Sequence, residues 1–267
     1  AGGEGGVWGG GGSGGAGGAG WTRCNAGPGH CAAFEVPLDW DNPDGTRIPF
    51  FVRKVPSGSV PPAGQLWLLE GGPGIAGWDL AFQVGLFQEL APGFDLYLPD
   101  YRGTGHSSWL GCEGETAWEV DPACSLTLLE NWGAGLRHFS TTAAALDIGR
   151  SIETLREGDL PVFVYGISYG TFVANRYLTL FPDQPQAAVL DSVCPASGCD
   201  VRMDRNFVRV AEHAFSLCGA DPLCSGKLGG DPWGRLLALF DRLAAGHCDA
   251  FLGFPANRIV LEQLVLL

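Results

Sequence analysis

The sequence predicts an α/β fold built on a doubly wound, mostly parallel sheet. Short apolar runs alternate with helical patterns between residues 65 and 193, as in sheets whose parallel strands are joined by helices. One of these runs, in 161–173, passes through a glycine-flanked turn directly into a helical pattern. Hydrophobic residues make up 46% of the 267 residues. This is enough apolar material for one large domain, or for one domain and part of a second.

The chain begins with glycine and small residues over 1–20, a composition that offers nothing to bury, so we expect this segment to be disordered. After a loop, residues 32–37 and 47–55 have the composition of strands. The residues between them, 41–45, read Asp-Asn-Pro-Asp-Gly, which favours a turn. The sequence therefore predicts an antiparallel hairpin at the entry to the sheet.

The parallel part of the sheet is predicted from four apolar runs, which are residues 65–70, 94–98, 161–165 and 187–193. We expect the last of them to be buried. Helical patterns follow the first and third runs, and a helix over 141–157, capped by Thr141 or Thr142, precedes the third. The first of these helical patterns rests on Leu80, Phe82, Val84, Leu86 and Leu90. Residues 108–140 show no regular pattern.

After Cys199 the strand signals stop, and residues 200–248 have helical patterns. The expected organisation is a disordered segment over 1–20, a core domain over 21–198 and an incomplete helical cap over 199–267. The last nine residues form an apolar run without a stop signal. We therefore expect the chain to be an N-terminal piece of a truncated fold.

The formal net charge is −13, and the 16 basic residues form no run, which argues against nucleic acid and anionic membranes as partners. No apolar run reaches the length of a membrane span. Nine cysteines favour disulfides and a secreted, extracellular protein. We predict the bonds Cys112–Cys124 and Cys218–Cys224, whereas the close pairs Cys24 with Cys31 and Cys194 with Cys199 are further candidates. The odd cysteine, free or paired with something beyond this chain, is taken to be Cys248. No C-x-x-C pattern occurs, so no metal site is predicted.

The chemistry of the chain is predicted from Gly166-Ile167-Ser168-Tyr169-Gly170. A strand, the pattern G-x-S-x-G and a helix together form the nucleophile elbow of α/β-hydrolases. The turn holds the Ser168 hydroxyl clear of the backbone and near the N–H groups of a helix N-terminus. Side chains at Gly166 or Gly170 would crowd the neighbouring strand and helix. The pattern also matches residues 11–15, but no strand precedes that match and no helix follows it.

Three motifs occur in order along the chain, namely residues 71–74 (Gly-Gly-Pro-Gly), 100–107 (Asp-Tyr-Arg-Gly-Thr-Gly-His-Ser) and 166–171. With residues 36–40 and 189–193, they resemble the proline-iminopeptidase and tripeptidyl-aminopeptidase family of α/β-hydrolases, and its larger secreted tripeptidyl branch most. The resemblance implies an α/β-hydrolase fold. It also implies a serine exopeptidase that acts on peptides with a free N-terminus and needs no cofactor.

The resemblance implies roles for further residues. The Gly-Gly-Pro-Gly loop supplies one N–H of the oxyanion hole, from Gly72 or else from Gly71, and Tyr169 supplies the other. Two backbone donors facing the developing oxyanion are what acyl transfer requires. Asp100, Arg102 and His106 are expected to be structural, with Arg102 holding the loops together.

The sequence departs from the family pattern at two points. Glu70 stands where the family has His or Asn-Pro, and a carboxylate beside an oxyanion hole is unfavourable unless it is paired or points away. A triad also needs an acid and a histidine. His213 and His247 lie within the apparent cap, and Asp191 comes too early in the chain for the acid of the family. We therefore expect the triad Asp and His to lie beyond Leu267.

Two other classes of protein remain open. An esterase or lipase of the same fold would have the same elbow, whereas an epoxide hydrolase would need Asp at position 168. A dinucleotide-binding oxidoreductase is suggested by residues 72–77, which match G-x-G-x-x-G after a strand, with Asp95 or Asp100 as the acid for the ribose. Against it, Pro73 removes an N–H from the proposed phosphate loop.

Overall fold

The computed structural model describes residues 20–25, 27–112, 114, 121–195 and 203–247. The chain divides into two compact units, Ala1–Ser197 and Gly198–Leu267. The predicted disordered segment lies outside the described residues except for Gly20, as do the second G-x-S-x-G match, Cys199 and Cys248. The assignment of the second unit as a cap stays a prediction.

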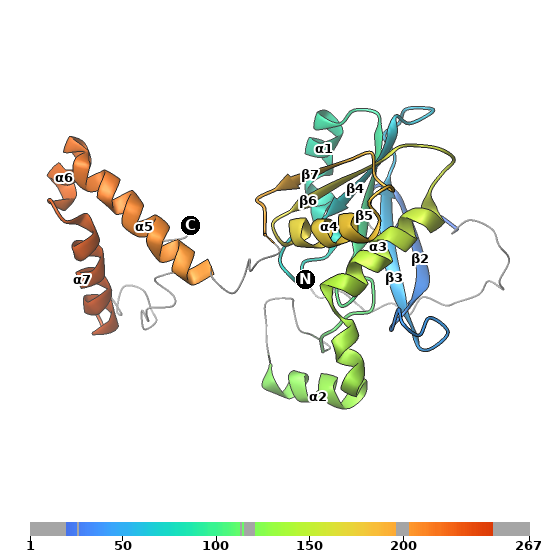
Figure 1. Ribbon diagram of the computed structural model, residues 1–267, viewed down its shortest axis with the longest axis horizontal. Coiled ribbons are helices and arrows are strands. Elements are labelled where there is room, and N and C mark those ends of the chain that lie inside the picture. The colour runs from blue at the N-terminus through green and yellow to red at the C-terminus, as the bar shows by residue number, and fades with distance from the viewer. Residues whose placement is uncertain (1–19, 26, 113, 115–120, 196–202, 248–267) are drawn as a thin grey trace. The chain divides into compact units, whose positions relative to one another are not determined.

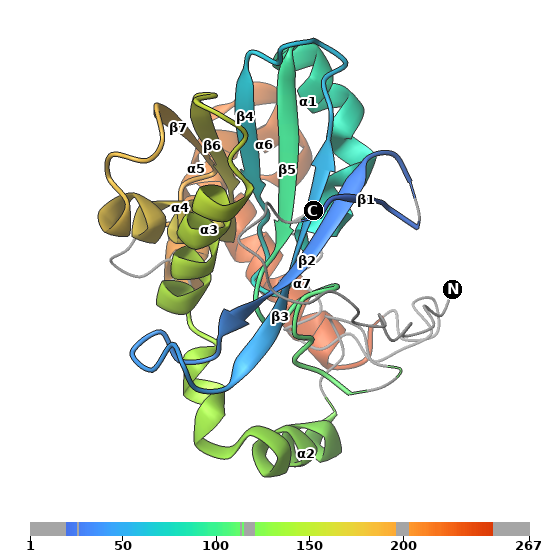
Figure 2. The same ribbon diagram turned by 90° about the vertical axis from the view of Figure 1, so that its right-hand side faces the viewer.

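The first unit contains a seven-stranded mixed sheet in the order β1-β2-β3-β5-β4-β6-β7 (Figure 1, Figure 2). Strands β1 to β3 and β5 pair antiparallel, and β5, β4, β6 and β7 pair parallel. The strands are β1 Thr22–Arg23, β2 His30–Pro37, β3 Arg47–Val55, β4 Gly64–Leu69, β5 Phe94–Asp100, β6 Val162–Ile167 and β7 Ala187–Asp191. The predicted antiparallel hairpin is confirmed by the pairing of β2 with β3, in which Pro37 lies opposite Arg47.

Helices cover both faces of this sheet (Figure 2). On one face α3 Thr141–Leu155 and α4 Tyr169–Leu180 pack over β3, β4 and β6, through side chains such as Ile148, Val173 and Trp67. On the other face η1 Gly77–Gln83 and α1 Val84–Leu90 pack over β4 and β5. Alternate residues of β4 point to the two faces, as the period of a strand requires, so Trp67 and Leu69 join one core and Leu68 the other.

The helical pattern predicted after β4 is confirmed over residues 77–90, but only part of its apolar stripe is buried. A 3₁₀ helix, η1, precedes a two-turn α1. The buried side chains are Leu80, Val84 and Phe87, whereas Phe82, Leu86 and Leu90 are exposed. The apolar residues of the predicted pattern are two or four residues apart, so they do not all lie on one face of a helix. The residues that pack on the sheet are three or four residues apart, as on one helix face.

Residues 108–140 were predicted to be irregular, and this is wrong for their second half. Helix α2 spans Pro122–Trp132, and the 3₁₀ helix η2 spans Gly133–His138. The Asp121 carboxylate caps α2 by accepting from the N–H of Ala123, and Pro122 occupies the first turn. Asp followed by Pro is a start signal for a helix. Helix α3 is likewise capped by Ser140, and not by the predicted Thr141 or Thr142.

Strand β7 forms as predicted over Ala187–Asp191, but it is not a buried strand. Ala187, Val189 and Asp191 are exposed, and Ala188 and Leu190 are half-buried. The reason is its position, because β7 is the last strand of the sheet and no described element packs beyond it. An apolar run thus indicates a strand here without indicating its place in the sheet.

Arg102 connects four segments of the first unit. Its guanidinium donates to both carboxylate oxygens of Asp147, at 2.7 Å each, and to the carbonyl oxygens of Pro37, Leu38 and His138. Arg102 therefore holds the ends of β2 and η2 and the middle of α3 against the loop after β5. All five of its N–H groups are used, which is the structural role that the sequence suggested.

Three disulfides are present among the described residues. The two predicted bonds, Cys112–Cys124 and Cys218–Cys224, form, and so does Cys24–Cys31. Cys194 is also disulfide-bonded. These bonds are typical of proteins from an oxidising compartment.

The described part of the second unit is helical, as predicted. Its helices are α5 Met203–Ala220, α6 Pro222–Leu228 and α7 Pro232–Ala244. Asp221 and Asp231 cap α6 and α7, each followed by a proline in the first turn. No helix among the described residues is both long and apolar enough to cross a membrane.

Candidate active site

Ser168 stands between strand β6 and helix α4, at the carboxyl edge of the parallel strands. Its backbone has φ 53° and ψ −121°, a conformation that residues other than glycine rarely adopt. The Ser168 N–H donates to the carbonyl oxygen of Asp191 on β7 at 2.9 Å, and its own carbonyl oxygen accepts from the N–H of Thr171. These bonds hold an exposed serine in a strained turn, the kind of strain found at functional sites.

The two glycines that flank this turn have no room for a side chain. A Cβ atom at Gly166 would lie 2.6 Å from the carbonyl oxygen of Gly170. A Cβ atom at Gly170 would overlap the carbonyl oxygen of Leu69 at the end of β4. Helix α4 therefore starts directly against two strands, which places the Ser168 side chain beside the loop that follows β4.

That loop, residues 71–74, lies against the serine. A Cβ atom on Gly71 would be 3.1 Å from the Cβ of Ser168 and 3.5 Å from its Oγ. Gly72 has φ 104°, a conformation that favours glycine. The N–H of Gly72 donates no hydrogen bond to any described residue. The N–H of Tyr169 lies in the first turn of α4, where amides have no partner within the helix.

Glu70, the departure from the family pattern, is bonded to the same loop. Its Oε1 accepts from the N–H of Gly71 at 2.7 Å. Burial raises the pKa of Glu70, with a smaller lowering by the Gly71 N–H and a further raising by the charge of Asp79. The bond engages the N–H of Gly71, so Gly72 is the better candidate of the two for an oxyanion donor.

A second acidic side chain lies at this edge of the sheet. The Tyr165 hydroxyl donates to Oδ2 of Asp191 at 2.6 Å, and the Ser192 hydroxyl donates to Oδ1 at 3.0 Å. These two hydrogen bonds lower the pKa of Asp191. Burial, and then the bond to Asp191, raises the pKa of Tyr165 to about 12. Asp191 is thus a carboxylate held by its neighbours, at the end of the strand beside the nucleophile elbow.

The histidines of the first unit have other contacts. His106 Nδ1 lies 3.1 Å from Oδ2 of Asp100, and its ring stacks on Phe51 at 4.7 Å between centroids. His138 Nδ1 lies 3.6 Å from Oδ1 of Asp39, and His30 begins strand β2 at the antiparallel end of the sheet. None of the three forms a hydrogen bond with Ser168. His213 and His247 belong to the second unit.

The acids expected of a dinucleotide site are engaged elsewhere. Asp100 is fully buried and accepts from the N–H groups of Trp78 and His106. Asp95 is buried, pairs with Lys54 at 3.1 Å and accepts from the N–H of Ser57. Neither carboxylate is available to a ribose. Among the described residues, no group of three His, Cys, Asp or Glu side chains is placed to hold a metal ion.

One supporting residue received no role from the sequence. The hydroxyl of Thr171 donates to the carbonyl oxygen of Ser168 at 2.7 Å and accepts from the N–H of Cys194 at 2.7 Å. Its side chain is buried, so it ties the elbow to the segment after β7. The motif at 166–171 contained this threonine, but its partner Cys194 lies 23 residues away.

A match to a known protein family identifies the family of this chain. The family described as the alpha/beta hydrolase fold matches residues 66–219, which include the loop 71–74, Ser168 and helix α4. The chain belongs to the α/β-hydrolase fold family. The mixed seven-stranded sheet with the elbow after β6 is the fold that the sequence predicted.

The similar curated proteins are peptidases, as the resemblance implied. Tripeptidyl aminopeptidase of Streptomyces lividans is 28% identical over 206 residues, which cover 65% of this chain and 38% of that protein. Serine protease Hip1 of Mycobacterium tuberculosis (strain CDC 1551 / Oshkosh) is 24% identical over 248 residues, 79% of this chain and 47% of that protein. Proline iminopeptidase of Aeromonas sobria is 32% identical over 162 residues, 58% of this chain and 35% of that protein. The chain covers less than half the length of each.

Proposed function

We propose that the protein is a serine peptidase that releases single amino acids or tripeptides from the free N-terminus of peptides. The observation that carries this proposal is the position of Ser168. The serine is exposed on a strained turn at a helix N-terminus, against a glycine loop with an unengaged N–H. The substrate class comes from the names of the similar proteins, which are a tripeptidyl aminopeptidase, a proline iminopeptidase and a serine protease.

In the proposed reaction the Ser168 hydroxyl attacks the carbonyl carbon of the scissile peptide bond. The carbonyl oxygen becomes negative and accepts from the N–H groups of Gly72 and Tyr169, the two proposed oxyanion donors. A histidine base takes the hydroxyl proton as the new C–O bond forms and gives it to the leaving nitrogen as the C–N bond breaks. Water then hydrolyses the acyl-enzyme and restores the Ser168 hydroxyl. The helix dipole of α4 adds a favourable potential at the same point.

A serine hydroxyl needs a histidine base that is oriented by a carboxylate. His30, His106 and His138 form no hydrogen bond with Ser168. We therefore propose that the triad histidine and acid come from outside residues 20–195. The proposed protein is secreted, because an oxidising compartment suits its disulfides.

The test uses the full-length protein that contains this chain. A fluorophosphonate should label Ser168, as located by mass spectrometry of the labelled peptide. Amino-acid and Ala-Ala-X arylamides should be hydrolysed faster than the same substrates with an acetylated N-terminus. Hydrolysis of short acyl esters without any arylamide cleavage would instead assign the protein as an esterase, and labelling of another serine would contradict the proposal.

A further inference from the structure

A cavity of about 300 Å³ opens beside the residues proposed to bind the oxyanion. Its walls come from the loop 71–74, through Pro73 and Gly74, from the loop after β5, from the start of α3 and from Tyr169. Pro73 and Tyr169 are each within one residue of an amide that we propose as an oxyanion donor. A group that enters this cavity must therefore be attached close to the reacting carbonyl carbon.

Apolar and aromatic side chains make up most of the walls of this cavity. Tyr101 and Tyr169 meet edge to face, with 6.4 Å between their ring centroids and 87° between their planes. Phe139 and Leu110 line the cavity from the segment before α3 and from the loop after β5. Ala144, which is buried on α3, presents only a methyl group to it. Aromatic rings of this kind favour apolar and aromatic ligand groups.

The polar side chains at the cavity have partners within the protein, and among them the Oγ of Ser140 accepts from the N–H of Ala143. Arg102 uses all of its N–H groups on Asp147 and on three carbonyl oxygens, as described above. The hydroxyl of Thr104 donates to the carbonyl oxygen of Tyr101 at 2.9 Å. The hydroxyls of Tyr169 and Thr141 bond to each other at 2.8 Å. A charged ligand group would find no unpaired counter-charge among the residues that line the cavity and would lose its hydration.

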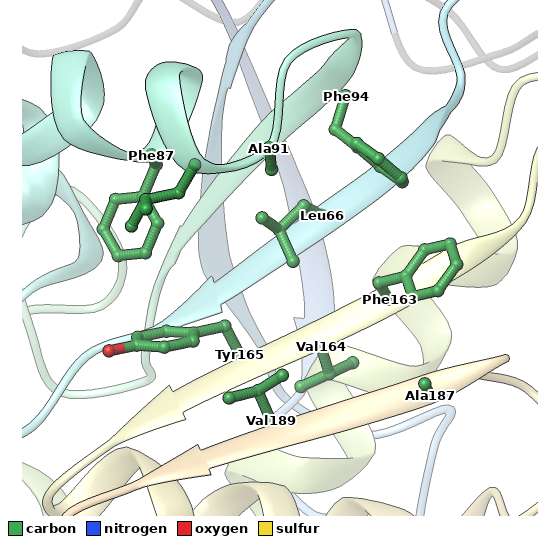
Figure 3. A pocket seen from close by; sticks show the side chains of 10 residues that line it. Leu66, Phe87, Ala91, Phe94, Phe163, Val164, Tyr165, Ala187 and Val189 are labelled. Atoms are coloured by element: carbon green, nitrogen blue, oxygen red, sulfur yellow. The ribbon is translucent and has the colours of Figure 1, made fainter.

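A second cavity on this sheet is less suited to a substrate. It measures about 250 Å³ and is lined by α1, by Phe94 at the start of β5, and by β4, β6 and β7 (Figure 3). Its lining includes Phe163 near the start of β6. Since a strand rises about 3.3 Å per residue, the Phe163 end of this cavity lies about 16 Å from Ser168 and its Tyr165 end about 10 Å away. Nothing in the structure shows what covers that cavity.

We infer that the cavity beside Tyr169 binds the side chain of the residue that contributes the scissile carbonyl, and that it selects an uncharged, apolar or aromatic side chain. The inference rests on the proposed function and adds the substrate class to it. The volume is at the lower end for ligand pockets and is suited to one side chain. Substrates with Phe or Leu at this position should react faster than those with Gly, and those with Lys or Glu should react slowest.

The experiment narrows and widens the cavity in the full-length protein. Ala144→Leu fills it, and Leu110→Ala enlarges it. The control is Ala91→Leu, the same change beside the other cavity. The first measurement is kcat/KM for arylamides with Gly, Leu, Phe, Lys or Glu next to one fixed leaving group. The second is the rate at which phosphonofluoridates with a methyl or a benzyl group on phosphorus label Ser168.

We expect Ala144→Leu to lower the Phe-to-Gly ratio of kcat/KM and the benzyl-to-methyl ratio of labelling by about ten-fold or more, the scale of size discrimination in an apolar pocket. Leu110→Ala should raise both ratios for the largest groups. This variant tests the inference if Ala144→Leu fails to fold. Ala91→Leu should leave both ratios unchanged.

Other results separate the inference from the proposed function. If both phosphonates label Ser168 at equal rates in the unaltered protein and in both cavity variants, the cavity assignment is wrong and the nucleophile stands. A Phe-to-Gly preference that neither cavity variant changes, or that changes in Ala91→Leu alone, also overturns the inference. If neither phosphonate labels Ser168 and no arylamide is cleaved, the proposed function itself fails.

Discussion

The Glu70 carboxylate accepts a hydrogen bond of 2.7 Å from the N–H of Gly71. Gly71 directly precedes Gly72, the proposed oxyanion donor. No lysine, arginine or histidine among the described residues pairs with Glu70. The bond orders the loop, but the negative charge opposes the charge that acyl transfer develops nearby. Glu70 therefore has two effects of opposite sign, and a substitution can separate them.

Glu70→Gln should keep the acceptor for Gly71 and remove the charge. Burial raises the pKa of Glu70, so the unaltered carboxyl is neutral below that raised pKa and negative above it. The ratio of labelling rates, Glu70→Gln over the unaltered protein, should be near one at low pH and rise with pH across this pKa. Fluorophosphonate labelling of Ser168 measured from pH 4 to 9 gives the ratio. Glu89→Gln, at an exposed site on α1, is the control and should give a flat ratio. A flat ratio for Glu70→Gln would show that its charge does not reach the reaction.

Ser168→Ala should lower kcat of the full-length protein on its best arylamide by about 10⁴-fold or more, as the loss of a triad nucleophile does. Ser192→Ala is a matched control, because Ser192 also has a positive φ, 57°, and lies at the end of the neighbouring strand. Both variants carry the same backbone cost, so only the loss of the nucleophile should abolish turnover. Activity retained in Ser168→Ala would refute the assignment.

Gly170→Ala should lower the free energy of unfolding by about 3 kcal/mol or more, because its Cβ meets backbone carbonyls of Leu69 and Glu70 that cannot move without breaking the turn. Gly85→Ala on α1 is the control, since a Cβ there meets nothing within 4 Å. It should be neutral or stabilise by up to about 1 kcal/mol, because alanine favours helix. Urea unfolding followed by circular dichroism measures both, and equal stabilities would contradict the crowding that we describe.

Asp147→Asn should destabilise the first unit by about 3–5 kcal/mol, because it leaves the buried Arg102 guanidinium without its counter-charge. The exposed fractions of the two side chains are 1% for Arg102 and 0% for Asp147, so water cannot replace the lost partner. Glu153→Gln removes the partner of Arg150 on the same helix, where both side chains are about half exposed. That change should cost less than about 1 kcal/mol. Thermal unfolding of the two variants compares them directly.

The sequence alone determined the features that depend on local pattern. Hydrophobic period and turn residues identified the hairpin of β2 and β3, the parallel strands and the elbow at Ser168, because these signals lie within a few residues of one another. Asp121-Pro122 is a further local signal, because it marks the start of α2 within the segment predicted to be irregular. The three motifs in order indicated the α/β-hydrolase fold, which the family match confirms.

Only the tertiary structure decided what depends on distant partners. Arg102 contacts Asp147, 45 residues away, and Thr171 contacts Cys194, 23 residues away. The exposure of β7 follows from its place at the end of the sheet, and the buried face of α1 follows from the strands beneath it. The cavity beside Tyr169 combines four segments of the chain. Local polarity sets which residues can be buried, but the packing of these segments sets which of them meet.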